Sequence, residues 1–322
     1  VAGQKILFLF EGLPSSRVQV RNFDDLPIPY RAIATDIVNG EMVVIEEGSL
    51  AEAMRASMSV PGVFDPALMD GRLLVDGGLV RNLPVDIVRQ MGAEHVIAVN
   101  VGTPLSTADE IGSVLTVIEQ MTALAVVANT RIQIEDLHPQ DVLLSPALGK
   151  DITSASFERF SEAFTLGYAA ALEQAQALAP FAVSEAEYAA WRDAVASCVT
   201  GEPVIQFVHL DNNSRFSDAV IRELIKIRPG STLDKTELNT DLQQIYGLGF
   251  IRLASYRVVE QDGQTGIEIQ VEEDARGTDF LETGITIAGS GRGTFFALRA
   301  AYLKTDLDER GSEFRAGIQL GD

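Results

Sequence analysis

The chain has 322 residues, of which 25 are Lys or Arg and 46 are Asp or Glu, so its formal net charge at pH 7 is −21. Its length suggests two or three domains, and its 46% hydrophobic content excludes a disordered acidic tail. The acidic balance argues against nucleic-acid binding, because phosphate neutralisation needs clustered Lys and Arg. The single cysteine, Cys198, excludes an internal disulfide framework and a cysteine-based zinc cluster.

Hydropathy and the chain ends carry further expectations. No apolar run reaches the roughly 18 residues of a transmembrane helix, which leaves membrane β-barrels open because their strands alternate. The first residue is Val, no secretory leader follows it, and the last residues come directly after a strand-like run. We therefore expect the chain to be a fragment of a longer polypeptide.

Residues 1–105 have the pattern of short strands joined by turns. The expected strands are 5–10, 30–35, 41–45, 73–75 and 95–101, with helices at 49–58 and 84–91. Asn39-Gly40 and Asp70-Gly71 are two-residue hairpin signals. The apolar run at 95–101 is typical of a strand that is buried on both faces of a parallel sheet.

Three longer helices are expected next. Apolar residues repeat at helical spacing through 111–134, and Phe157, Phe160, Phe164 and Tyr168 share one face of a second helix. A third helix starts at Ser184, where Glu187 completes a capping box. Strands and helices in this order indicate an α/β layer structure.

The character of the sequence changes at 198–203, which we take as a domain boundary. A strand at 204–210, helices at 217–227 and 234–246, and strands at 250–259 and 267–271 give the order β-α-α-β-β. From Leu281 onward apolar and polar residues alternate. Every second residue from Phe296 to Tyr302, and again from Phe314 to Leu320, is apolar, so each segment has one apolar face. This alternation fits either an antiparallel sheet with one solvated face or two strands of a transmembrane barrel.

Asp76-Gly77-Gly78 is the first candidate for chemistry. Asp76 ends an apolar strand, where a poorly solvated carboxylate has a raised pKa that suits a general base. The two glycines would allow a sharp turn. A plain Asp-Gly turn is the alternative, and Asp70-Gly71 is such a turn elsewhere in the chain.

Other candidates are weaker. Asp36, at the end of the 31–36 segment, could be a second carboxylate or part of a polar turn. The segment 57–64 could simply end a helix. The chain contains no Gly-x-Ser-x-Gly nucleophile elbow, the three histidines have no triad or metal spacing, and 289–293 lacks the Lys of a phosphate loop. No metal or cofactor is expected.

Three ordered blocks together resemble the bacterial patatin-like phospholipase family. They are Asp25–Asp36, Ala53–Phe64 with its Ala-Ser-Met-Ser-Val-Pro core, and Asp70–Pro84 with the Asp-Gly-Gly segment. The resemblance covers about residues 1–195 and implies a Ser–Asp dyad that hydrolyses lipid esters, with Asp76 as the base and Gly77 and Gly78 supporting it. The family's oxyanion loop and serine elbow lie upstream of these blocks, so this chain alone is expected to be inactive.

Residues 203–275 resemble a POTRA domain, through the element order and Gly247-Leu248-Gly249-Phe250-Ile251. Residues 279–322 look like the first strands of the surface-antigen barrel that follows such domains. The combination is similar to type V autotransporter phospholipases. It implies an outer-membrane or cell-surface location in a Gram-negative bacterium, a passenger that is displayed or secreted, and a phospholipid or other lipid ester as substrate.

The expected fold is therefore an α/β, three-layer, N-terminally truncated patatin-like part (1–198), a β-α-α-β-β POTRA domain (203–275) and antiparallel strands of an incomplete barrel (279–322). We expect 279–322 to be disordered or a frayed hairpin here, because a barrel needs its full set of strands. Two alternatives remain. One is a non-catalytic transport or assembly component that binds extended segments at the hairpin edge of 250–259 and 267–271. The other is a soluble binding module without a membrane link.

Overall fold

The structure is a computed structural model. It describes residues 3–11, 22–153, 156–197, 202–273, 279–290, 293–304 and 314–321. The chain divides into two compact units, one of Val20–Val199 with Val1 and one of Ala2–Gln19 with Thr200–Asp322. Each unit has its own core of buried apolar side chains, so each is stabilised by its own packing.

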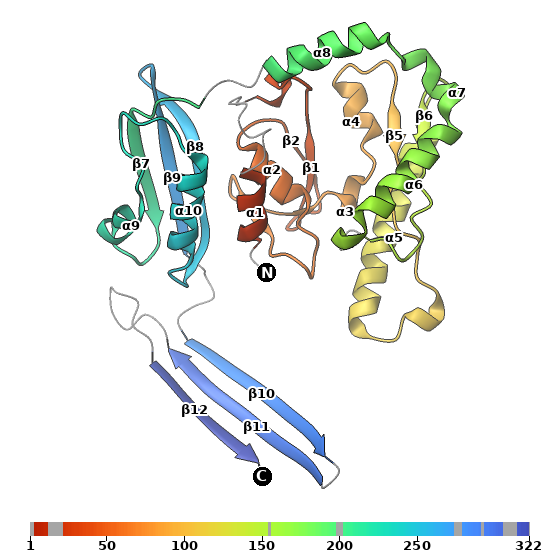
Figure 1. The fold of residues 1–322 in the computed structure, drawn as a ribbon. Helices are drawn as coiled ribbons and strands as arrows, with labels where there is room; N and C mark the ends of the chain where they lie inside the picture. The colour runs from red at the N-terminus through yellow and green to blue at the C-terminus, as the bar shows by residue number, and fades with distance from the viewer. Residues whose placement is uncertain are drawn as a thin grey trace. The chain divides into compact units, whose positions relative to one another are not determined.

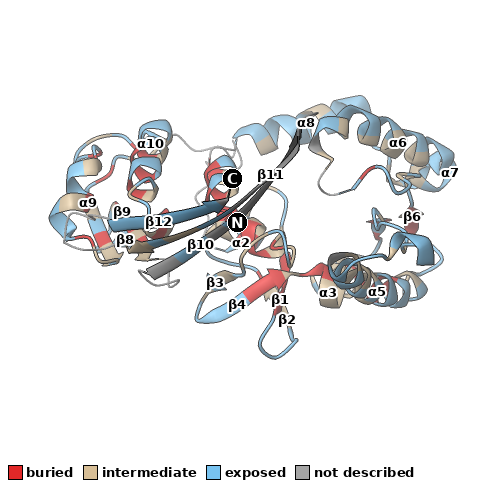
Figure 2. Cartoon of the chain, turned by 90° about the horizontal axis from the view of Figure 1, so that it is seen from below, coloured by how far each residue is buried: buried red, intermediate tan, exposed pale blue. Residues whose placement is uncertain are grey.

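The first unit begins with an antiparallel sheet of four strands in the order β2-β1-β4-β3. Figure 1 labels β1 and β2 beside α2, and Figure 2 labels all four strands. Its elements are β1 (Ala32–Asp36), β2 (Met42–Ile45), α2 (Leu50–Ser57), β3 (Ala67–Met69) and β4 (Arg72–Asp76). Phe23, Ala34, Ala53 and Leu74 belong to one cluster, and α2 covers the sheet through its alanines. The strands and the helix expected here are confirmed.

Both hairpins have the turn chemistry that the sequence indicated. Gly40, between β1 and β2, has a φ of +75°, and Asp70 and Gly71 have φ values of +50° and +76°. Two consecutive residues with positive φ match the right-handed twist of the flanking strands β3 and β4. The turn chemistry therefore sets the pairing of Met69 with Arg72.

The second half of this unit holds a parallel pair of short strands and the helices. The elements are α3 (Gly78–Arg81), α4 (Val85–Gln90), β5 (Ile97–Val99), α5 (Val114–Glu135), β6 (Val142–Leu144), α6 (Phe160–Glu173), α7 (Ala175–Leu178) and α8 (Glu185–Ser197). The strand β5 pairs in parallel with β6. The expectation that β5 is buried on both faces is wrong, because Val96 and Ala98 face the core while Ile97 and Val99 are 47% and 46% exposed. Among the described residues this sheet has two strands, and one side of β5 packs against Leu83 and Val85.

The three long helices α5, α6 and α8 lie where the sequence predicts them. The Ser184 hydroxyl caps α8 by accepting from the Glu187 amide at 3.3 Å, and the Glu187 carboxylate accepts from the Ser184 amide at 2.9 Å. The apolar faces of α5 and α6 are exposed. On α6, Phe160, Phe164 and Tyr168 share a face at four-residue spacing, and all three are more than half exposed. Figure 2 shows α5, α6 and α8 largely in the colours of exposed and intermediate residues.

The second unit contains the β-α-α-β-β order that the sequence indicates. Its elements are β7 (Phe207–Asn213), α9 (Asp218–Leu224), α10 (Lys235–Tyr246), β8 (Ile251–Gln261) and β9 (Gln264–Glu273). β9 lies in the centre, parallel to β7 and antiparallel to β8. Of the two strands expected to form a free hairpin edge, only β8 is therefore an edge strand. Asp234 caps α10 by accepting from the amides of Thr236 and Glu237.

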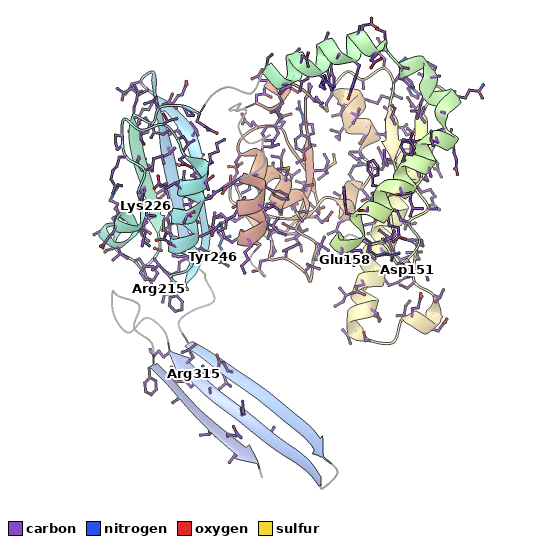
Figure 3. All side chains as sticks on the ribbon, viewed as in Figure 1. Asp151, Glu158, Arg215, Lys226, Tyr246 and Arg315 are labelled. Carbon is purple, nitrogen blue, oxygen red and sulfur yellow. The ribbon has the colours of Figure 1, made fainter. Side chains whose placement is uncertain are left out.

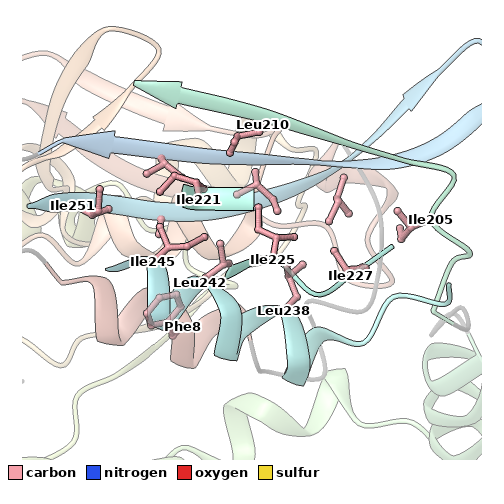
Figure 4. Packing of buried hydrophobic residues seen from close by; sticks show 14 of the residues in the cluster. Phe8, Ile205, Leu210, Ile221, Ile225, Ile227, Leu238, Leu242, Ile245 and Ile251 are labelled. Carbon is pink, nitrogen blue, oxygen red and sulfur yellow. The ribbon is translucent and has the colours of Figure 1, made fainter. Parts of the chain in front are cut away.

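The core of this unit forms between the sheet and α10. Figure 4 shows Leu238, Leu242 and Ile245 of α10 facing the strands, and each is fully buried. Phe8 joins the same cluster and packs edge-to-face on Tyr246, with ring centroids 6.5 Å apart.

Phe8 lies on α1 (Gln4–Glu11), a helix where the sequence pattern predicted a strand. The expected strand at 5–10 is therefore wrong. Gln4 and Phe8, one turn apart, both contact this unit, which is the spacing of a helix face. The Gln4 side chain donates to the Ala254 carbonyl at 2.7 Å and accepts from the Ala254 amide at 3.2 Å, so a side-chain amide replaces a strand neighbour on β8.

An ion pair joins the loop that follows β7 to the end of β9. Arg215, labelled in Figure 3, pairs with Glu273 at the end of β9, and its guanidinium lies 5.0 Å from the Phe250 ring centroid. The Arg215 amide donates to the same Glu273 carboxylate at 3.0 Å. Charge and packing therefore hold the loop after β7 against β9.

The C-terminal residues form an open antiparallel sheet of β10 (Asp279–Ser290), β11 (Gly293–Lys304) and β12 (Phe314–Gly321). The expectation of disorder or a frayed hairpin is wrong for the described residues, because β11 pairs along its length with β10 and along eight residues with β12. Leu298 lies opposite Leu320, whereas Arg299 lies opposite Gln319 and donates to it at 2.8 Å. The alternation of apolar and polar positions is confirmed. Among the described residues, no helix is long and apolar enough to cross a membrane.

Candidate functional site

Asp76 is the last residue of β4 and is half-buried. The two residues before it, Leu74 and Val75, are each 1% exposed, and Asp76 pairs with Ala34 of β1. The buried strand therefore places the Asp76 carboxyl group at the end of the sheet. Burial raises the pKa of Asp76 above its ordinary value of 3.8, and a hydrogen bond from the Gly78 amide opposes this rise. That bond measures 2.7 Å to Oδ1 and fixes the carboxylate.

Gly77 and Gly78 are needed here for space rather than for an unusual backbone angle. Gly77 has a φ of −65° and a ψ of −20°, which any residue can adopt. A Cβ at Gly77 would lie 2.2 Å from the Ile33 carbonyl oxygen, and one at Gly78 would lie 2.9 Å from Asp76 Oδ1. The backbone of β1 therefore excludes a side chain at Gly77, whereas a Cβ at Gly78 would displace the Asp76 carboxylate.

The other two sequence blocks meet Asp76 at its backbone. The Asp76 amide donates to the Ser59 carbonyl at 3.0 Å, and the Gly77 amide donates to the Ser57 carbonyl at 3.4 Å. From β1, the Thr35 hydroxyl donates to the Asp76 carbonyl at 2.9 Å. The three blocks singled out from the sequence thus converge on one residue.

The loop after α2 is held by a buried cation. Arg55, only 6% exposed, donates to the Ser59 hydroxyl and, at 3.0 Å, to the Asp65 carbonyl. Its guanidinium lies 5.0 Å from the Phe64 ring centroid. Burial lowers the pKa of Arg55, and the charge of Asp65 opposes that change. The segment 57–64 is therefore more than a helix stop, because it supplies carbonyls to the Asp76 strand.

The remaining candidates do not join this site. Asp36 is buried at the end of β1, where its carboxylate accepts from the Val38 amide at 3.0 Å and its carbonyl accepts from the Gly40 amide. It thus serves the hairpin turn, which was the simpler of its two interpretations. His95, His138 and His209 are exposed. Within the described residues, no cluster of three His, Cys, Asp or Glu could hold a metal ion, and Cys198 lies outside them.

Sequence reasoning missed a set of polar side chains on α5. Asn129, Thr130 and Gln133 are 9%, 6% and 4% exposed, whereas Ile132, one of the apolar residues that repeat at helical spacing, is 56% exposed. These polar groups bond to the segment that follows Asp76. Three polar residues within a strongly apolar helix are the signal that could have identified them.

Comparison with known proteins bears on both units. Residues 15–89 match the family described as "Patatin-like phospholipase", and residues 203–274 match POTRA, described as "Surface antigen variable number repeat". Both resemblances noted from the sequence are confirmed at this level. The patatin match contains Asp76, Gly77 and Gly78 and ends before α5.

Relatives with curated descriptions share the patatin-like part. The chain is 49% identical over 85 residues to mouse patatin-like phospholipase domain-containing protein 7. It is 46% identical over 95 residues to human patatin-like phospholipase domain-containing protein 6, and 46% identical over 77 residues to an uncharacterized NTE family protein of Mycobacterium tuberculosis. These alignments cover 26%, 28% and 24% of this chain, but only 6%, 7% and 21% of the relatives.

A solved structure resembles part of the chain. It is BamA from Haemophilus ducreyi lacking POTRA domains 1-3, with a TM-score of 0.28 and 18% identity. The likeness covers 36% of this chain and 22% of that one.

Proposed function

We propose, for a chain that combines a patatin-like phospholipase segment with a POTRA domain, that the first unit is part of a lipid acyl ester hydrolase with Asp76 as its general base. The observation that carries the proposal is the Asp76 carboxyl, which is desolvated at the end of a buried strand and fixed by the Gly78 amide. A base needs a raised affinity for protons and a defined position, and this geometry supplies both.

The chemistry assigned to Asp76 is proton transfer to and from a serine. The serine oxygen would attack the ester carbonyl while Asp76 takes its proton, and the leaving alcohol would take that proton back as the acyl-serine forms. Water would then release the fatty acid by the same exchange. The 322 residues contain no Gly-x-Ser-x-Gly elbow. In this proposal the nucleophile therefore lies outside them, and residues 1–322 alone have no activity.

The test compares two Asp-Gly dipeptides in the full-length protein. Asp76→Asn keeps the size of the side chain and removes the base, and we expect fatty acid release from phospholipid vesicles to fall by at least about 10³-fold. Asp70→Asn is the matched control, since Asn also tolerates the positive φ of Asp70. Hydrolysis unchanged in Asp76→Asn would exclude Asp76 as the base, whereas no hydrolysis by the unaltered full-length protein would favour a non-catalytic scaffold.

We also propose that the second unit and the β10–β12 sheet belong to an outer-membrane module of the type V secretion class in a Gram-negative bacterium. The POTRA match and the alternation of apolar and polar positions in β11 and β12 support this. Detergent extraction and heat-modifiable gel migration of the full-length protein test it. Recovery of the intact protein in the soluble fraction would contradict it.

A further inference from the structure

α5 carries buried polar side chains that its own helix does not require. Valine, methionine and isoleucine side chains on this helix are exposed, for instance Val114 at 79% and Met121 at 66%. Asn129 is 9% exposed, so the helix buries a polar amide while several of its apolar side chains face solvent. Burying an amide is unfavourable unless its donors and acceptor are bonded. The partners of Asn129 therefore indicate what it does.

All these partners but one lie in the segment that follows Asp76. Asn129 Oδ1 accepts from the Asn82 amide at 2.8 Å, and Asn129 Nδ2 donates to the Gly78 carbonyl at 2.8 Å and the Leu79 carbonyl at 3.3 Å. The remaining bond goes to the Ala125 carbonyl of its own helix at 2.9 Å. One side chain thus binds both the beginning and the end of α3.

The connection from Asn129 to the carboxylate runs through a single residue. Gly78 accepts the Asn129 side-chain amide through its carbonyl and donates its own amide to Asp76 Oδ1. The space beside Gly78 is filled, because a Cβ there would lie 2.9 Å from the Asp76 carboxylate and 3.6 Å from Val126 of α5. A residue bonded on both sides and packed on both sides has little freedom to move.

We propose that Asn129 is a positioning residue for Asp76: it holds Gly78 by its carbonyl so that the Gly78 amide stays on the carboxylate. The inference rests on the proposed function only in treating Asp76 as a base. It adds a residue beyond the matched patatin-like segment, which ends at residue 89. Nothing in the Asp-Gly-Gly motif itself points to α5.

α5 also provides a control. Gln133 lies one turn further along the same buried face and accepts from the Asp86 amide at 3.1 Å. It binds α4 and not the residues next to Asp76. A purely structural role of the buried polar face predicts equal effects of losing Asn129 and Gln133, whereas positioning predicts an effect on Asp76 from Asn129 alone.

The experiment titrates the Asp76 carboxyl carbon by NMR in the 322-residue chain, labelled at aspartate and assigned with Asp76→Asn. We expect Asn129→Leu to raise the Asp76 pKa further, because the Gly78 amide no longer holds its hydrogen bond to the charged carboxylate, and to speed exchange of the Gly78 amide about tenfold. Gln133→Met should leave both unchanged. Asn129→Ser, which is too short to reach the Gly78 carbonyl, should act like Asn129→Leu if the leucine variant does not fold.

An unchanged Asp76 titration in the Asn129 variants, or an equal shift in Gln133→Met, would overturn the proposal. Both readouts are independent of turnover. A failure of Asp76→Asn to abolish hydrolysis would therefore refute the proposed function without affecting the positioning result.

Discussion

Gly77 shows why the site could be located in the sequence but not explained from it. An Asp-Gly-Gly segment after an apolar run predicts a carboxylate at a strand end, and the structure places Asp76 there. The sequence interpretation assigned the glycines to a sharp turn, yet Gly77 has ordinary helical angles. Its constraint is the Ile33 carbonyl on the neighbouring strand, and such a contact between distant residues leaves no local pattern.

Gly77→Ala should therefore destabilise the first unit. The new Cβ would meet backbone at 2.2 Å, so β1 or β4 must shift, and we expect a loss of about 1–3 kcal/mol in the free energy of unfolding. Gly167→Ala is the control, since nothing lies within 4 Å of a Cβ on that helical residue. It should stabilise by about 0.5–1 kcal/mol. Urea unfolding measures both, and equal effects would refute the steric explanation.

The raised pKa of Asp76 also predicts how stability depends on pH. The folded state holds the proton more tightly than the unfolded state, whose value is close to 3.8. Its contribution to stability is therefore present below the unfolded pKa and is lost as pH rises from 3.8 through the folded pKa. Asp76→Asn should remove this loss, so the wild-type and variant curves of unfolding free energy should diverge over that window. Parallel curves would contradict a raised pKa.

At the scale of elements, local sequence signals predicted the turns and helix caps, whereas packing determined which faces of the elements are buried. The turns at Gly40 and Asp70-Gly71 and the cap at Asp234 are chemical signals within a few residues, and each is found in the structure. The prediction of a strand at 5–10 is wrong because an unbroken apolar run fits a strand and a helix alike. The exposed faces of β5 and α6 could not be predicted, because periodicity shows which residues share a face but not what covers it.

The stripe on α10 gives a prediction at this scale. Leu242 is fully buried in the core of the second unit, so Leu242→Ala should cost about 2–5 kcal/mol through lost packing and a cavity. Leu172→Ala makes the same chemical change on α6, where the side chain is 58% exposed, and should cost less than about 0.5 kcal/mol. Thermal or urea denaturation compares them, and similar losses would place the core elsewhere.

At the scale of the whole molecule, the order of its parts could be inferred from ordered motifs and a change of pattern near residue 200. The chain divides there into two units, and family matches fall on either side. The contribution of α5 to the site could not be inferred, because Asn129 reaches Gly78 only when the chain folds. If the protein binds a lipid surface, as the proposed function requires, its net charge of −21 predicts that binding relies on apolar contact rather than on attraction to anionic headgroups.

The pH dependence of kcat/KM for lipid ester hydrolysis by the full-length protein tests the central claim most directly, because it reports the base of the free enzyme. If Asp76 is that base, the acidic limb lies above pH 3.8, coincides with the NMR titration of the Asp76 carboxyl, and moves to higher pH with it in Asn129→Leu. An acidic limb that differs from the Asp76 titration, or that stays in place when the titration moves, would contradict the assignment.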